Sequence, residues 1–354
     1  MTAAFLPDVA QPSAPAAPAA APAPAGRAAQ RDWLDALSRE EIQALLRPSD
    51  WRSWLSLAVD WGLVFGAMAL VAAWPHPWTL PLAVVLALFL IGARQLGLAI
   101  LMHEAAHRSL FASRRVNDFV GRWLCAYPIW SDLDAYRAYH LQHHARTGTA
   151  EDPDLGLVTP FPITGASLRR KILRDLSGRT GIKFARAARA RSVARARTSA
   201  TARRALIGVV ATNAALLAGL AVLGHAELYL LWVGAWLTTN TLVTRIRAIA
   251  EHALAPDPGD PLNNTRTTLA SPLERLFLAP NRVNYHLEHH LLMTVPHYRL
   301  PEMHRLLRDR GVLDDACVDR GYWRVLRRAA SKGTPAEPRL SPNPAGGAPY
   351  VTAG

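Results

Sequence analysis

The chain has 354 residues, of which 50% are hydrophobic, and it carries a formal net charge of +13. The apolar residues lie in long runs and most arginines lie outside them, which argues against a pair of ordinary soluble domains. The two cysteines, Cys125 and Cys317, exclude a framework of several disulfides and a C-x-x-C metal or redox motif.

Both ends of the chain are rich in proline and alanine. Residues 1–36 lack the basic start and the uninterrupted apolar stretch of a signal peptide, so we predict a disordered tail there. Residues 331–354 favour the same interpretation. One domain is predicted over residues 37–330. It opens with a capping box, Ser38 with Glu41, and a short amphipathic helix on the membrane surface.

Four segments are long and apolar enough to cross a membrane, at about 54–74, 80–102, 205–223 and 228–247. Tryptophans bracket the first segment, as expected for side chains at the two interfaces. The loops WPHPWT and GHAE contain no lysine or arginine, whereas the stretch between the second and third segments is rich in arginine. The positive-inside rule therefore places both termini and this stretch in the cytoplasm, and the expected location is a bacterial inner membrane.

The arginine-rich stretch from Arg169 to Arg204 has two interpretations. It is a juxtamembrane segment that contacts anionic lipid, or it is a docking surface for an acidic electron donor or an anionic substrate head group. Aromatic residues do not interleave the arginines and no nucleic-acid-binding motif is present, which argues against a nucleic-acid partner.

Two ionisable residues fall inside predicted spans, Asp60 in the first and Arg94 in the second. Each lies about 9 Å below the cytoplasmic interface at 1.5 Å per residue. Because charges at this depth tend to pair, we predict an ion pair or a shared water at the floor of a substrate entrance. Alternatively, each side chain reaches the interface separately. Thr238, Thr239 and Asn240 in the fourth span either bond neighbouring helices or line a channel between them.

Histidines are concentrated in three motifs, HEAAH at 103–107, HLQHH at 140–144 and HLEHH at 286–290. Side chains three or four residues apart share a helix face, so each motif presents a strip of imidazoles, which suit iron, zinc or copper. His252 lies at the cytoplasmic end of the fourth span. Since all of them fall on one side of the membrane, we predict one metal site with the ligands His103, His107, His140, His143, His144, His252, His286, His289 and His290.

The other four histidines lack this spacing. His76 and His225 lie in outer loops, and His297 and His304 follow the third motif. We interpret these four as structural or solvated.

The three motifs, with the Glu251–His252 pair between the last two, resemble the histidine boxes of the integral-membrane fatty acid desaturases. That superfamily includes hydroxylases and carotenoid ketolases. The resemblance covers about residues 55–310 and implies two non-haem iron ions, held by the nine histidines in a cytoplasmic helical cap. At one position the chain departs from the acyl-CoA branch: Ala248 stands where that branch has an asparagine.

The activity implied by the resemblance is O2-dependent desaturation of a fatty acyl chain. The chain has no H-P-G-G haem motif, so the electrons would come from a separate ferredoxin or cytochrome-b5-type donor. Carboxylates near the motifs either orient imidazole N–H groups or keep their helices soluble. These carboxylates are Glu104, Glu251, Glu288, Asp152 and Asp154.

The expected fold class is thus an all-α integral membrane protein, with four transmembrane helices and a cytoplasmic helical cap holding a di-iron site. A lipid or carotenoid hydroxylase or ketolase is the alternative within the same chemistry. A non-catalytic membrane metal-binding or transport protein is the alternative from another class. Transport predicts ionisable ligands inside the spans, whereas these histidines lie beyond them. Spacing alone does not assign individual histidines to either iron ion.

Overall fold

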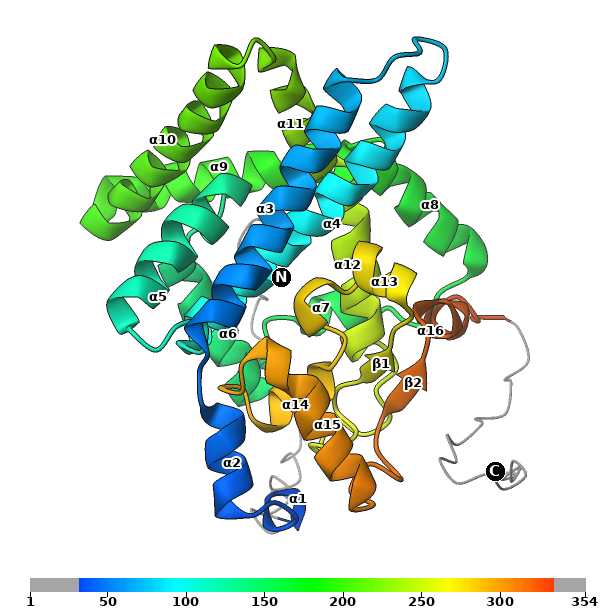
Figure 1. Ribbon diagram of the computed structural model, residues 1–354. Helices are drawn as coiled ribbons and strands as arrows, with labels where there is room; N and C mark the ends of the chain where they lie inside the picture. Colours follow the sequence, from blue (N-terminus) through cyan, green and yellow to red (C-terminus); the bar gives the residue numbers. More distant parts are fainter. Residues whose placement is uncertain (1–31, 334–354) are drawn as a thin grey trace.

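The fold is mainly helical, with one pair of short strands (Figure 1). The computed structural model describes residues 32–333, so the predicted tails fall largely outside the described part of the chain. The helices are α1 (Asp32–Asp35), α2 (Arg39–Leu46), α3 (Asp50–Ala72), α4 (Leu80–His107), α5 (Arg114–Val120), α6 (Leu133–Arg146), α7 (Leu155–Val158), α8 (Gly165–Leu176), α9 (Arg179–Thr198), α10 (Ala200–Val222), α11 (Tyr229–Leu237), α12 (Thr239–His252), α13 (Pro272–Phe277), α14 (His286–Leu291), α15 (Leu300–Asp309) and α16 (Tyr322–Ala329). The strands are β1 (Thr267–Leu269) and β2 (Val318–Arg320), and short 3-10 or π-helical turns cover Gly121–Ala126, Tyr127–Ile129, Ala226–Leu228, Pro280–Arg282 and His297–Arg299.

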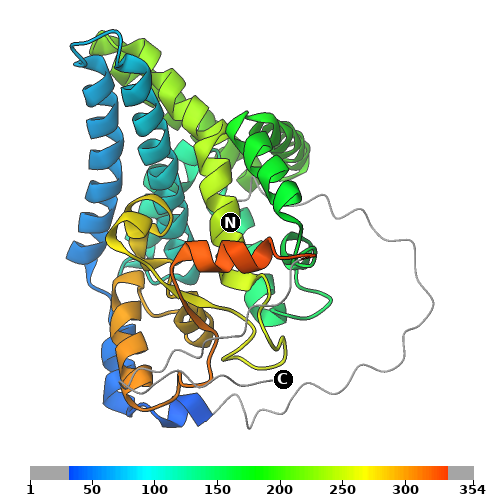
Figure 2. The same cartoon turned by 90° about the vertical axis from the view of Figure 1, so that its right-hand side faces the viewer.

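Three helices of the described chain, α3, α4 and α10, are long and apolar enough to cross a membrane. They correspond to the first three predicted spans. Helices α3 and α4 lie side by side in both views (Figures 1 and 2). The predicted second span ended at residue 102, but α4 continues to His107. The first histidine motif is therefore the last turn of a membrane helix, held on the same rigid element as the span.

The fourth predicted span is not one helix. It is divided into α11 and α12 at Thr238, whose backbone leaves the helical region with φ −117° and ψ −84°. The hydroxyl of Thr238 donates to the Gly234 carbonyl at 2.6 Å. Asn240 Nδ2 donates to the Gly92 carbonyl of α4 at 3.1 Å, and Thr239 Oγ1 donates to Leu88 of the same helix. Threonine and asparagine bond readily to backbone groups outside the helical pattern, which explains the break. The predicted hydrogen bonds between helices are present.

Helices α4 and α12 are in close contact at Gly92, and this contact provides a test of the packing. A Cβ built there would lie 2.2 Å from Thr239 Oγ1 and 2.7 Å from the Asn240 nitrogen. We expect Gly92→Ala to destabilise the protein by about 1–3 kcal/mol, because the backbone must shift. The measurement is thermal unfolding of the purified protein in detergent. Gly62→Ala is the matched control, because a Cβ there meets nothing within 4 Å. Equal unfolding temperatures for the two variants would contradict the packing.

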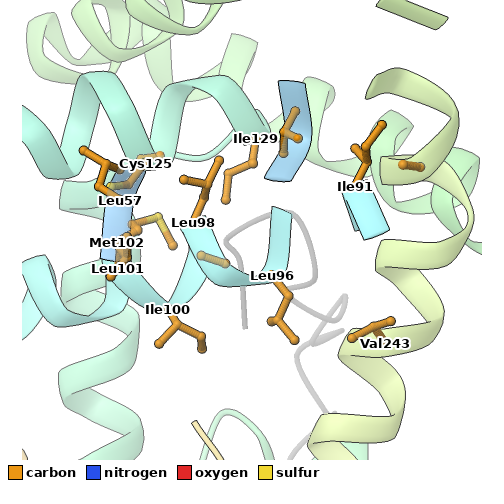
Figure 3. Close-up of a cluster of buried hydrophobic side chains, with 14 of the residues drawn as sticks. Leu57, Ile91, Leu96, Leu98, Ile100, Leu101, Met102, Cys125, Ile129 and Val243 are labelled. Carbon is orange, nitrogen blue, oxygen red and sulfur yellow. The ribbon is translucent and has the colours of Figure 1, made fainter. Parts of the chain in front are cut away.

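The C-terminal half of α4 is the centre of the hydrophobic core. Its residues are buried on every side from Ile91 to His107, as expected for a helix that is apolar all round. Figure 3 shows Leu96, Leu98 and Met102 of this helix among side chains of neighbouring elements, including Val243 of α12. This packing fixes the end of α4 that carries the histidines.

The predicted ion pair between α3 and α4 forms. Arg94 Nη1 lies 3.2 Å from Asp60 Oδ1, and both side chains are buried. Asn281 Nδ2 donates to Asp60 Oδ2 at 2.7 Å, and Arg94 Nη2 donates to the Leu276 carbonyl. The pair therefore joins the two spans to the segment that precedes the third histidine motif.

Two details of the lower part of Figure 1 differ from the predictions. Helix α1 occupies residues that were predicted as tail, because Trp33 is buried against the apolar cluster of α2, α14 and α15. The fold is also not entirely α-helical, since β1 and β2 form a parallel pair with Thr267 opposite Val318. The predicted capping box, Ser38 with Glu41, begins α2.

Candidate metal centre

The nine predicted histidines gather in two groups at the ends of α4, α6, α12 and α14. Within each group, one nitrogen from every ring lies within 4.8 Å of the others. We call them the five-histidine group and the four-histidine group. The five-histidine group contains His103, His107, His140, His144 and His289. The four-histidine group contains His143, His252, His286 and His290.

Helical periodicity explains how two motifs contribute to both groups. His140 and His144 are four residues apart and share a face of α6, and both enter the five-histidine group. His143 lies between them in sequence and enters the other group. In α14 the pair four apart, His286 and His290, enters the four-histidine group. Helices α6 and α14 therefore hold the two groups side by side.

Distances between ring nitrogens match those of ligands around a common ion. The Nε2 atoms of His140 and His144 are 2.9 Å apart, and those of His144 and His289 are 3.0 Å apart. In the other group, the Nε2 atoms of His252 and His286 are 2.9 Å apart. Two imidazoles bound at right angles to one ion, with metal–nitrogen distances of about 2.0–2.1 Å, would be about 3 Å apart.

Protonation and hydrogen bonding also fit a metal site. Burial, followed by the neighbouring rings of His107 and His143, lowers the pKa of His144 to about 2. Burial also holds the pKa of four further rings outside the membrane-spanning segments well below the usual value, so these imidazoles are neutral at pH 7, as metal ligands must be. The four rings are His140, His286, His289 and His290.

Both nitrogens of His103 and of His107 are buried without a hydrogen-bond partner among the described residues. Leaving buried polar atoms unpaired costs about 1–3 kcal/mol each. A bound ion would pair with one nitrogen of each ring. The donor set, made only of imidazoles, suits iron, zinc or copper.

Four of the five predicted carboxylates lie beside a ring of the groups. Asp152 Oδ1 is 2.7 Å from His143 Nδ1, and Asp154 Oδ2 is 3.7 Å from the same atom. Glu104 lies 3.4 Å from His103 Nδ1, and Glu251 lies 3.6 Å from His286 Nδ1. The short contact of Asp152 fixes the proton of His143 on Nδ1, which leaves its Nε2 free to bind a metal.

Within the described residues, the Glu288 side chain bonds a histidine outside the two groups. Its side chain is buried, and within the described chain it contacts His304 Nδ1 at 2.5 Å and the Thr267 hydroxyl. It therefore neither orients a ring of the two groups nor faces water. His297 bonds Ser56 through Nε2 at 2.9 Å. His297 and His304 are thus structural and buried, and His76 and His225 are exposed.

The sequence analysis did not single out Arg247, which lies on α12 next to both groups. Its Nε donates to Glu251, and its Nη1 is buried without a partner among the residues described. Together with His103, His286 and His289 it lines a cavity of about 10 Å³, close to the smallest volume that holds one water. The signal in the sequence was the spacing of four between Arg247 and Glu251, which puts them on one helix face.

Ala248 lies one residue further along α12. Its methyl group offers no ligand atom, so the four-histidine group has no polar partner from this position.

Comparison with known proteins identifies the family. A model of the fatty acid desaturase family matches residues 80–318, a segment that includes all nine histidines of the two groups. The chain therefore belongs to the fatty acid desaturase family. With its three apolar helices, it is a membrane oxidoreductase of that family.

The names of individual relatives differ in the activity that they state. The chain is 28% identical to dihydrorhizobitoxine desaturase of Bradyrhizobium elkanii over 280 residues, which are 75% of this chain and 78% of the relative. It is 28% identical to beta-carotene ketolase of a Paracoccus species over 62% of this chain and 79% of the relative. It is 32% identical to sn-1 oleoyl-lipid 12-desaturase of a Picosynechococcus species over 34% of this chain and 32% of the relative.

Proposed function

We propose that the protein is an O2-dependent di-iron desaturase that introduces a double bond into a fatty acyl chain. The observation that carries the proposal is the pair of adjacent groups made only of histidines, each able to hold one metal ion. Two iron ions held there would supply the activation of O2 that breaks an unactivated C–H bond. The ligands of one ion would be the five-histidine group, and those of the other the four-histidine group.

The overall reaction balances with one external donor. Two adjacent carbons of the acyl chain each lose a hydrogen atom, and a carbon–carbon double bond forms. O2 accepts four electrons, two from these C–H bonds and two from a separate ferredoxin or cytochrome-b5-type protein. With two protons from the substrate and two from solvent, it yields two waters.

The residues of the chain position and shield this site. Asp152 holds the proton of His143 on the ring nitrogen that faces away from the four-histidine group. Arg247 bonds Glu251 and so fixes its carboxylate. Because this carboxylate lies beside His286, it restrains the His286 ring. Six of the nine rings are buried, which limits the access of bulk water to the reacting atoms.

Membrane topology is part of the same proposal. Helices α11 and α12 together would form the fourth crossing, interrupted at Thr238. The arginine-rich α8 and α9, the termini and the histidine groups would face the cytoplasm. The absence of lysine and arginine from the loops WPHPWT and GHAE supports this orientation. The Asp60–Arg94 pair would then lie at the floor of the substrate entrance.

A second candidate function is hydroxylation or ketone formation on a lipid or carotenoid. The similarity to a beta-carotene ketolase along 79% of that relative favours it. The two reactions use the same kind of metal site and differ in which C–H bonds lie beside it. Analysis of the product therefore decides between them.

The experiment is mass spectrometry of the lipids of a bacterial host that expresses the chain together with a ferredoxin and its reductase. We expect a new unsaturated acyl species, absent when His289→Ala replaces the wild type. His225→Ala is the matched control, because that ring is exposed and lies outside both groups. A hydroxylated or keto product would select the second candidate. An unchanged lipid profile, with iron present in the purified protein, would contradict both.

A further inference from the structure

A cavity of about 720 Å³ lies between α9, α10, α11 and the turn that leads into α6. These green helices occupy the upper half of Figure 1. The volume falls in the range of about 300–1,000 Å³ that is usual for ligand sites. None of the nine grouped histidines lines it. The cavity is thus separate from the metal centre.

One wall of the cavity is apolar. Helix α11 contributes residues from Tyr229 to Leu237, a rise of about 12 Å at 1.5 Å per residue. Helix α10 contributes Val209 and Val210, and the latter side chain is 62% exposed, so this wall continues onto the outer face of a candidate span. A hydrocarbon chain from the membrane can follow this wall.

Helix α9 adds the basic part of the lining, beside the apolar Ile182, Ala185 and Ala188. Arg186, Arg189, Arg191 and Arg195 line the cavity, and Asp132 is the single carboxylate among the lining residues. Arg195 Nη1 lies 3.4 Å from Asp132 Oδ2. Arg186 and Arg189 have no ion-pair partner within residues 32–333, and Arg191 Nη2 is buried without a hydrogen bond there. Three of the four guanidinium groups are therefore available to an anion.

Two more residues of the wall have unsatisfied donors. Ser131 Oγ and Trp236 Nε1 are buried, and each is without a partner in the described part of the chain. A hydroxyl and an indole N–H both donate hydrogen bonds. A ligand rich in acceptor oxygens, such as a phosphate diester with acyl ester groups, would complement them.

We propose that this cavity binds an anionic phospholipid, with its phosphate against the arginines of α9 and an acyl chain between α10 and α11. An acidic protein would complement the arginines but not the apolar wall, and a neutral lipid would leave the arginines without a partner. Charged lipid head groups attract such basic segments at the membrane surface. The site goes beyond the proposed function because lipid binding there requires neither iron nor O2.

The test is native mass spectrometry of the full-length protein in a non-ionic detergent. Phosphatidylglycerol and phosphatidylcholine with identical acyl chains are the probes, and we expect at least tenfold tighter binding of phosphatidylglycerol. Arg186→Gln with Arg189→Gln should weaken its binding roughly 30-fold, since each cation near an anionic head group contributes about a factor of five. Lys183→Gln with Arg197→Gln is the matched control, because it removes two charges of α9 outside the cavity. The affinity of this control variant for phosphatidylglycerol should stay within twofold of the wild-type affinity.

A second variant tests the apolar part of the site. Ala188→Trp places a large ring into the cavity from α9 and should also weaken phosphatidylglycerol binding at least tenfold. An unchanged unfolding temperature would show that the variant is folded. Equal affinity for the two lipids, equal losses in the control pair, or full binding by folded Ala188→Trp would each overturn the proposal. If the Arg186/Arg189 variant loses only the binding of an acidic ferredoxin, the surface docks a protein and the lipid assignment is wrong.

Discussion

His286→Ala is expected to leave one iron ion per chain, against the two that we propose for the wild-type protein. His286 belongs to the four-histidine group, and its removal leaves three ring nitrogens there. Loss of a residue that merely orients a ligand lowers metal affinity about 10–100-fold, so loss of a ligand should cost at least that much. The five-histidine group keeps all of its rings. The measurement is iron content per chain by inductively coupled plasma mass spectrometry after gel filtration.

The reciprocal variant is His107→Ala, which removes a ring from the five-histidine group only. It should also reduce the iron content to about one ion, and the two variants combined should bind almost none. His225→Ala serves as the control and should retain two ions. If His286→Ala and His107→Ala retained full iron content while folded, the two groups would not be the metal sites.

Arg94→Met and Asp60→Asn should each destabilise the protein by about 3–5 kcal/mol, because each leaves the other charge buried without its partner. The two side chains are 4% and 0% exposed, so neither remaining charge can reach water without rearrangement. The double variant carries no unpaired charge, so its loss of stability should be clearly smaller than the sum of the two. The measurement is a double-mutant cycle of unfolding free energies in detergent.

The control for the charge change is Asp309→Ala, at a carboxylate that is 56% exposed. Exposed ion pairs contribute about 0–1 kcal/mol, so this variant should unfold close to wild type. Additive losses for Asp60 and Arg94 would show that the pair is not energetically coupled, whatever its geometry.

Local and membrane-imposed features could be predicted from the sequence. The length of an apolar run is set by bilayer thickness, which is why the bounds of α3, α4 and α10 lie close to the predicted spans. The Asp60–Arg94 pair followed from the depth of two charges in neighbouring spans. The capping box at Ser38 depends on residues three apart. The three histidine motifs were recognisable because helical spacing alone puts their rings on common faces.

Other features depend on segments that meet only in the folded chain. The break at Thr238 is held by bonds from α12 to α4, and the strand pair joins Thr267 to a residue 51 positions later, Val318. Glu288 bonds His304 because α14 packs against α15. The arginine-rich sequence of α9 did not show that α10 and α11 close a cavity against it.

The sequence by itself determined which histidines belong to the candidate centre, since their spacing, position and residue type are properties of single helices. Only the tertiary structure decided how they divide. His143 lies between His140 and His144 in the chain, yet its ring joins those of His252 and His290 from other helices. That partition depends on the rotation of α6 relative to α4, α12 and α14. Packing of side chains far apart in sequence sets this rotation, and no single helix encodes it.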